Sequence, residues 1–406
     1  MRILRRSRWL AVLAGCIALA CGAAGPAQAQ VRSTGAVFQS HVVASWGDNT
    51  SGQLGDGTTA GRTLFGDIGA GNQVVQVDGG FDHSLAVMSD GSVWGWGANF
   101  SGELGPGLGS RPLTPVRIQG LTGVFTQVAA GNRFSLALRS DGTVWAWGDN
   151  LRGELGRGTV TSQEATPARV AVLNHVTRIS AGGGFGLALR SDGIVFAWGA
   201  NELGQLGTGT TADRPVPAKI AGLSQVTGIS AGWDSAAATE ASSTSAVTSV
   251  WTWGANNEGQ LGDGTQAGHT TPERIAGVPV SVAGVSVGVQ FAVLLGTDGS
   301  VWGWGDNGAG QLALASRDAP VTRPVNTIAA GSHITQLSAG AGHVLALRSD
   351  GTVLGWGYNG GGQLGNGTTA ASSGPVPVTG LTSVTQVSAG FLFSLAVHVV
   401  PFLVGS

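Results

Sequence analysis

Residues 134–150 read Phe-Ser-Leu-Ala-Leu-Arg-Ser-Asp-Gly-Thr-Val-Trp-Ala-Trp-Gly-Asp-Asn. Hydrophobic side chains alternate with small or polar ones on both sides of Asp141-Gly142, which is the pattern of two half-buried strands. An Asp-Gly pair favours the tight turn of a β-hairpin, because glycine adopts positive φ without steric cost. The stretch therefore predicts two antiparallel strands, at 134–138 and 144–147, joined by that turn.

The Trp-Gly-x-Asn tetrapeptide that ends this stretch recurs through the chain. Its tryptophans follow one another at spacings of 50 to 55 residues: Trp46, Trp96, Trp147, Trp198, Trp253, Trp304 and Trp356. A fixed period of this length indicates a propeller or a solenoid. Most copies continue as Asn-x-x-Gly-Gln/Glu-Leu-Gly, and the sixth departs by ending in Ala313.

Each repeat holds two further short strands. In the copy around the hairpin, residues 126–129 precede it, and in the copy before that one residues 116–118 follow Pro115. A proline beside this outer strand fits, because an edge strand tolerates a missing amide donor. Four strands make one propeller blade, so the sequence predicts an all-β, seven-bladed β-propeller with repeats from about 42 to 397.

The two ends of the repeat array complement one another. Residues 42–46 resemble the third strand of a blade that lacks its hairpin partner, and residues 394–397 resemble a second strand that lacks its third. Pairing the two would close the ring and leave no orphan edge at the chain ends.

The phased motifs resemble the regulator of chromosome condensation repeat over essentially the whole array. The resemblance implies a seven-bladed propeller, but it implies less about function, because propellers host unrelated activities. Within that superfamily, exchange factors act on a nuclear GTPase, and a secreted bacterial branch includes a propeller-type β-lactamase inhibitor.

The N-terminus has the pattern of a secretory signal peptide. Four arginines precede an apolar stretch from Trp9 to about Gly22, and Ala27-Gln28-Ala29 fits a cleavage site. We expect residues 1–29 to be removed and residues 30–406 to form a single propeller domain, secreted or periplasmic. The stretch is too short for a transmembrane span. A rival site at Leu13-Ala14-Gly15-Cys16 would instead give a lipoprotein anchored through Cys16.

Composition excludes several function classes. Cleavage after Ala29 would remove both cysteines and four of the 21 basic residues, leaving 17 basic against 23 acidic residues. A net charge of −6 and a single lysine, Lys219, argue against a nucleic-acid partner. We expect a monomer.

Candidate catalytic and metal-binding residues have better structural explanations. His83 lies between Asp82 and Ser84, but its counterparts in the other repeats are mostly aromatic: Phe134, Phe185, Ser235, Phe291, His343 and Phe393. A position that alternates with phenylalanine is a packing position rather than part of a triad. The other histidines lack metal-ligand spacing, and no phosphate-binding loop is present. We predict no enzyme activity and no cofactor.

Two sites per blade vary from copy to copy and are therefore free for recognition. One follows the Ala-Gly turn and the other follows Trp-Gly-x-Asn, and strand direction places both at one face. We predict that this face binds a partner through Phe81, Asp82, Phe100, Asn132, Arg133, Arg152, Trp233, Asp234, Tyr358 and Phe391. Aromatic and arginine side chains are enriched at interface hot spots. We expect Trp233 to be an exposed indole surrounded by Phe81, Phe100 and Phe391. By the same argument the Ser/Thr-rich loop at 239–249, which replaces an Asp-Gly turn, belongs to the opposite face.

We thus predict a secreted or periplasmic protein-binding scaffold whose partner is unknown. The same aromatic residues would also serve a carbohydrate or cell-surface adhesion module. A propeller lyase is disfavoured by the absence of a unique polar cluster. A guanine nucleotide exchange factor is disfavoured by the export signal.

Overall fold

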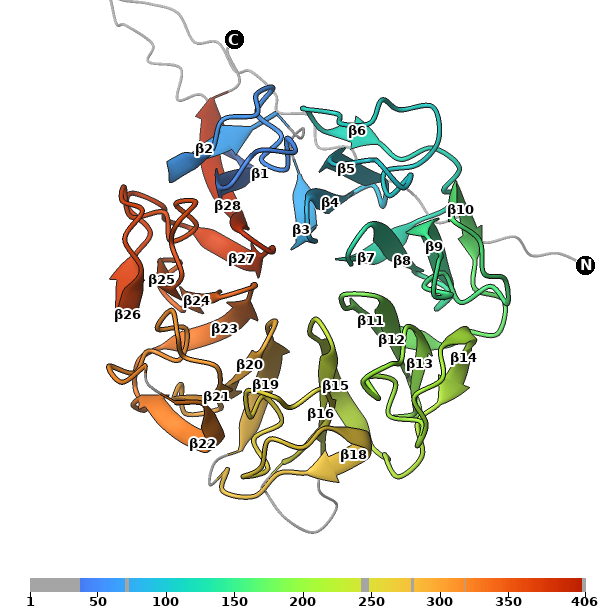
Figure 1. The fold of residues 1–406 in the computed structure, drawn as a ribbon. Coiled ribbons are helices and arrows are strands. Elements are labelled where there is room, and N and C mark those ends of the chain that lie inside the picture. Colours follow the sequence, from blue (N-terminus) through green and yellow to red (C-terminus); the bar gives the residue numbers. More distant parts are fainter. Residues whose placement is uncertain (1–36, 70–72, 242–247, 279–280, 318, 404–406) are drawn as a thin grey trace, which may run out of the picture. The chain divides into compact units, whose positions relative to one another are not determined.

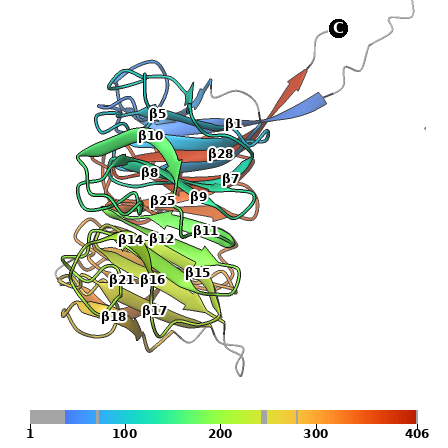
Figure 2. The same ribbon diagram turned by 90° about the vertical axis from the view of Figure 1, so that its right-hand side faces the viewer.

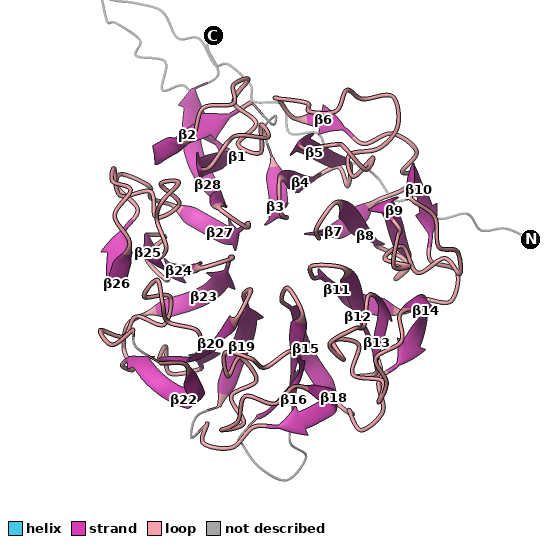
Figure 3. Cartoon of the chain, viewed as in Figure 1, coloured by secondary structure: helices cyan, strands magenta, loops and turns pink. Residues whose placement is uncertain are grey.

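The predicted hairpin at 134–147 forms as two strands, and it and six equivalent strand pairs surround a common centre. A computed structural model describes residues 37–403, apart from 70–72, 242–247, 279–280 and 318. The unit Phe38–Phe402 holds seven four-stranded antiparallel sheets arranged as a ring (Figure 1). No helix occurs among the described residues (Figure 3). The predicted all-β, seven-bladed propeller is confirmed.

Blades 1 to 3 follow one another along the chain, each running from its innermost to its outermost strand. Blade 1 holds β3 (Val74–Gly79), β4 (His83–Met88), β5 (Val93–Gly97) and β6 (Val116–Arg117). Blade 2 holds β7 (Phe125–Ala130), β8 (Phe134–Arg139), β9 (Val144–Asp149) and β10 (Gln163–Arg169). Blade 3 holds β11 (Val176–Ala181), β12 (Phe185–Arg190), β13 (Val195–Gly199) and β14 (Arg214–Lys219).

Blades 4 to 6 repeat this order. Blade 4 holds β15 (Val226–Ala231), β16 (Ser235–Glu240), β17 (Ser249–Gly254) and β18 (His269–Arg274). Blade 5 holds β19 (Val282–Val287), β20 (Phe291–Gly296), β21 (Val301–Gly305) and β22 (Val321–Ile328). Blade 6 holds β23 (Ile334–Ala339), β24 (His343–Arg348), β25 (Val353–Gly357) and β26 (Ser372–Pro377). Much of the Ser/Thr-rich loop between β16 and β17 lies outside the described residues.

Blade 7 joins the two ends of the chain. Its strand order is β27 (Val384–Ala389), β28 (Phe393–Leu403), β1 (Val37–Gly47) and β2 (Arg62–Ile68), so β1 completes the sheet begun by β27 and β28. The two central strands of this blade, β28 and β1, lie side by side in both views (Figures 1 and 2). The predicted closure is confirmed, and both strands extend beyond the predicted segments.

The hydrophobic core lies between neighbouring blades. One cluster joins Leu136 and Val144 of blade 2 to Ile179 and Trp198 of blade 3. The second strand of each blade is almost wholly buried, whereas the outermost strands are largely accessible. Stability in a fold without a described disulfide therefore comes from packing one sheet face against the next.

The repeated tryptophans link the blades by hydrogen bonds as well as by packing. All seven are fully buried. Each indole N–H donates to a backbone carbonyl at the Gln/Glu position of the preceding blade, over 2.7–2.9 Å. In the closing blade, Trp46 donates to the carbonyl of Gln363, 317 residues away. The tryptophans are packing residues, as the sequence predicts, and they do not form an aromatic cage.

The glycine and asparagine of Trp-Gly-x-Asn shape the loop after each third strand. Gly148 has φ +112°, and an added Cβ would lie 2.5 Å from the carbonyl oxygen of Arg133. Asn150 accepts the amide of Leu155 through Oδ1 at 3.2 Å and donates to the carbonyl of Thr159 through Nδ2 at 3.1 Å. These contacts recur in the other copies and hold seven similar loops at one end of the strands.

Candidate functional site

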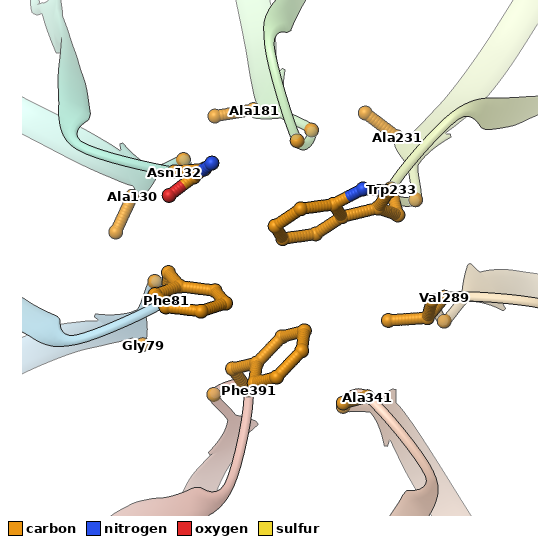
Figure 4. Close-up of a pocket in the computed structure, with 18 of the residues that line it drawn as sticks. Gly79, Phe81, Ala130, Asn132, Ala181, Ala231, Trp233, Val289, Ala341 and Phe391 are labelled. Atoms are coloured by element: carbon orange, nitrogen blue, oxygen red, sulfur yellow. The ribbon is translucent and has the colours of Figure 1, made fainter. Parts of the chain in front are cut away.

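The seven turns between first and second strands converge on the centre of the ring. One residue from each turn lines a shared pocket: Phe81, Asn132, Gly183, Trp233, Val289, Ala341 and Phe391. The pocket has a volume of about 90 Å³ and lies among the Ala-Gly backbones of the same turns. Figure 4 shows the larger of these side chains directed into the centre from different blades.

Three aromatic rings meet at this centre. The rings of Phe81 and Phe391 are 4.3 Å apart between centroids, and the Trp233 indole lies 5.5 Å from Phe81 and 5.4 Å from Phe391. The rings are tilted by 44° to 52°, within the range of favourable aromatic pairs. We call Phe81, Trp233 and Phe391 the central aromatic cluster.

The state of Trp233 differs from the sequence-based expectation. We expected an exposed indole surrounded by Phe81, Phe100 and Phe391, but the residue is half-buried. Two of the three neighbours are present, because the turns of blades 1 and 7 also point inward. Phe100 does not line the pocket, because it follows the third strand of its blade, farther from the centre.

The loops after the third strands present more exposed side chains. Phe100 is 56% exposed and Tyr358 is 42% exposed. These loops lie at the same end as the central turns, since the amide of Tyr358 donates to the carbonyl of Gly342 and that of Ala98 to the carbonyl of Asp82. Both sets of variable positions therefore lie at one face, as strand direction predicts, with an inner and an outer set of residues.

The two predicted arginine contacts differ in their availability. Arg133 is exposed and has φ +63°. The guanidinium of Arg152 contacts the carboxylates of Asp213 and Glu202, at 2.5 and 2.6 Å. Arg152 therefore braces two neighbouring loops of its own chain, and its charge is largely compensated.

Asp82 and Asp234 follow two members of the cluster directly. Neither carboxylate makes a hydrogen bond or an ion pair with a described residue. Burial raises the pKa of both, and a second carboxylate adds to the shift, Asp48 for Asp82 and Glu202 for Asp234. The positive charge of Arg133 opposes the shift at Asp82, whereas no cation does so at Asp234.

Three other buried or half-buried carboxylates lie in the loops of this face. Burial raises the pKa of Glu103, Asp149 and Glu154, and the charge of Asp149 raises that of Glu154 further. Arg133 partly compensates Glu103 and Asp149. The face thus combines an apolar aromatic centre with several carboxylates around it.

The repeats that carry these turns and loops match a known family of sequence repeats. The regulator of chromosome condensation (RCC1) repeat model matches residues 90–138, 141–189, 192–239, 249–295, 298–347 and 350–397. The chain belongs to this family. A second model of the same repeat matches five stretches that overlap these, including 74–103 and 334–363.

Relatives of this RCC1-repeat chain include proteins of different size. The chain is 30% identical to the ultraviolet-B receptor UVR8 of Arabidopsis thaliana, over 82% of this chain and 76% of the receptor. It is 32% identical to the human E3 ubiquitin-protein ligase HERC2, over 86% of this chain but only 7% of the ligase. The chain thus corresponds to one small part of the latter.

Solved RCC1-type propellers share the fold. Human WBSCR16 superposes with a TM-score of 0.79 at 21% identity, covering 88% of this chain and 98% of that protein. Prp20p of Saccharomyces cerevisiae gives 0.79 at 22% identity, covering 91% and 93%. These structures support the blade architecture.

The histidine that resembled part of a triad is a core residue in this RCC1-type propeller. His83 is buried, and its Nε2 lies 3.1 Å from the hydroxyl of Ser135 in the next blade. His343 makes the same contact with Ser394 at 3.1 Å. Burial lowers the pKa of both imidazoles to about 3, so they pack as neutral groups. This agrees with the packing role inferred from the alternation with phenylalanine.

Within the described residues, no three or more acidic, histidine or cysteine side chains are grouped to hold a metal ion. Nor does that part of the chain contain a helix that could cross a membrane.

Sequence reasoning missed one feature of the face. A second pocket, of about 270 Å³, lies between the loops of blades 3 to 5 and includes Trp233 and Asp234. Several of its other members, among them Leu203, Asn257 and Gln290, occur at the variable positions noted in the sequence. Their clustering depends on the angle between adjacent blades, which no single repeat encodes.

Proposed function

We propose that this chain is a protein-binding scaffold that contacts its partner through the face carrying the central aromatic cluster. The observation that carries the proposal is the convergence of Phe81, Trp233 and Phe391 in one pocket. The fold does not require these residues, because other blades place Asn132, Gly183 or Ala341 at the same position. Aromatic side chains that the fold does not require, and that gather at a surface pocket, fit a recognition role.

Relatives support a binding role in general terms. Yeast Prp20p, which shares the fold, binds Gsp1p and histones. The acidic composition of this chain argues against a nucleic-acid partner, and no wedge-like insertion interrupts the repeats. We propose that catalysis is not its function, because the buried histidines are neutral core groups and the repeated Asp-Gly pairs serve turns.

We also propose that the protein acts outside the cytoplasm. The charged, apolar and small-residue segments of residues 1–29 support export followed by cleavage before Gln30. The lipoprotein alternative through Cys16 would place the same scaffold on a membrane surface.

The experiment uses the exported protein as it is secreted by its host or by a bacterial expression strain. Mass spectrometry of its N-terminus is expected to show Gln30, and a lipidated Cys16 would contradict cleavage there. The purified protein is then used as bait against secreted and periplasmic proteins, and in parallel on a glycan array. We expect the bait to capture a protein that binds at the face carrying the central aromatic cluster. Binding confined to glycans would favour the adhesion function instead.

A further inference from the structure

The pocket beside Trp233 combines an aromatic wall with an unpaired acid. It lies where the turns of blades 4 and 5 meet the loops after β13 and β17. Its lining includes Trp233, Asp234, Leu203, Asn257, Val289 and Gln290. A volume of about 270 Å³ makes it larger than the central pocket, and the two share Trp233 and Val289.

The charge of Asp234 is not compensated by the described part of the chain. Its carboxylate has no hydrogen bond and no ion pair there, and the neighbouring Glu202 adds a second negative charge. The nearby Arg152 is engaged with Glu202 and Asp213. The remaining polar side chains of the pocket are amides, which can accept hydrogen bonds through their oxygens.

Blade 1 provides an internal comparison. Phe81-Asp82 is the counterpart of Trp233-Asp234, but Arg133 lies close enough to lower the pKa of Asp82. No arginine or lysine has this effect on Asp234. An indole attracts cations more strongly than a phenyl ring does, so the blade 4 pair is the better cation site of the two.

We propose that this pocket receives an arginine or lysine side chain of the partner protein, held over the Trp233 indole and against the Asp234 carboxylate. The inference rests on the proposed function, because it assigns the chemistry of the partner at the same face. A protruding loop that carries the basic side chain between apolar residues would fill both the pocket and the adjoining aromatic centre. The partner is then a protein with a basic loop, not an acidic one.

The test selects binders from a phage library of disulfide-constrained heptapeptides of random sequence. We expect the selected peptides to be enriched in arginine or lysine. The dissociation constant of one such peptide is then measured by calorimetry against wild type, Asp234→Asn and Asp350→Asn. Asp234→Asn is expected to weaken binding at least tenfold. Asp350→Asn is the matched control, because Asp350 is an exposed carboxylate in the turn between β24 and β25 at the opposite end of the strands, and it is expected to weaken binding less than threefold. Replacing the basic residue of the peptide with methionine should cost as much as Asp234→Asn, and the two losses should not add.

Each of four outcomes would overturn this assignment. The selected peptides could lack basic residues, or they could bind Asp234→Asn as tightly as wild type. If Trp233→Ala still abolished their binding, the proposed function would stand and the assignment of a basic side chain to the pocket would be wrong. An equal loss in Asp350→Asn would attribute the effect to the net charge of the protein and not to the pocket. A library with no peptide dependent on Trp233 would contradict the proposed function itself. Thermal melts of each variant establish that it is folded.

Discussion

At the scale of single residues, Asp78 is the clearest departure from the repeat. It lies on β3, and five of its counterparts are serines: Ser180, Ser230, Ser286, Ser338 and Ser388. The serine hydroxyls accept amides from the innermost strand of the next blade, as Ser180 does from Ala231 at 3.0 Å. Asp78 does the same with the amide of Ala130 at 2.8 Å, but through a carboxylate. This carboxylate lines the central channel, a space of about 260 Å³ between the innermost strands. Burial raises its pKa to about 6.

This raised pKa predicts a pH-dependent cost in stability. The native state binds the Asp78 proton more tightly than the unfolded state, so its favourable contribution is present below about pH 4 and is lost as pH rises through 6. Asp78→Ser should therefore increase the free energy of unfolding at pH 8 by about 1 kcal/mol, because the carboxylate is only partly shielded from the channel. Denaturant titrations at pH 4 and pH 8 measure the difference. An equal effect of the substitution at both pH values would contradict this.

Residue roles that depend on distant partners could not be predicted. Arg152 was expected to contact a partner, yet Asp213 lies 61 residues further along the chain and occupies its guanidinium. The half-buried state of Trp233 likewise depends on rings from blades 1 and 7. By contrast, comparison between repeats correctly identified His83 as a packing position, because the fold applies the same requirement seven times.

At the scale of elements, strand β1 closes the ring, and we expect this closure to stabilise the propeller. It contributes Val43, Ala44 and Trp46 to the buried core and pairs with both β28 and β2. Deleting residues 30–46 would expose two strand edges and remove a buried tryptophan, a type of loss that costs about 3–5 kcal/mol or more. We expect a lower melting temperature, restored when a synthetic peptide of residues 37–47 is added.

A truncated protein that melts at the wild-type temperature would show that closure by β1 does not stabilise the propeller. A scrambled peptide of the same composition is the control for the restoration.

The elements were the most predictable level of this structure. Alternation around Asp141-Gly142 and its equivalents predicts the second and third strands, because each hairpin is local and its turn chemistry is specific. Closure followed from two incomplete ends that fit one another. The pocket beside Trp233 could not be found in this way, because its walls come from three blades and its shape depends on how the blades pack.

At the scale of the whole molecule, the seven blades act as a frame that fixes seven turns around one centre. Propeller architecture determines where each variable residue lies, and the choice of residue then determines the chemistry of the face. Phe81, Trp233 and Phe391 supply an apolar centre, and Asp82 and Asp234 supply charge beside it. The central claim is that a protein partner binds at this centre.

The most direct test compares the affinity of the captured partner for wild type, Trp233→Ala and the control Leu64→Ala, whose side chain is 46% exposed on the outer strand β2. Trp233→Ala also loses two ring contacts, so we expect it to be destabilised by about 1 kcal/mol and to remain folded at 25 °C. Affinity is measured by surface plasmon resonance on folded protein. We expect Trp233→Ala to weaken binding by roughly 30-fold, about 2 kcal/mol, and Leu64→Ala to bind as wild type does. Wild-type affinity in a folded Trp233→Ala variant would contradict it.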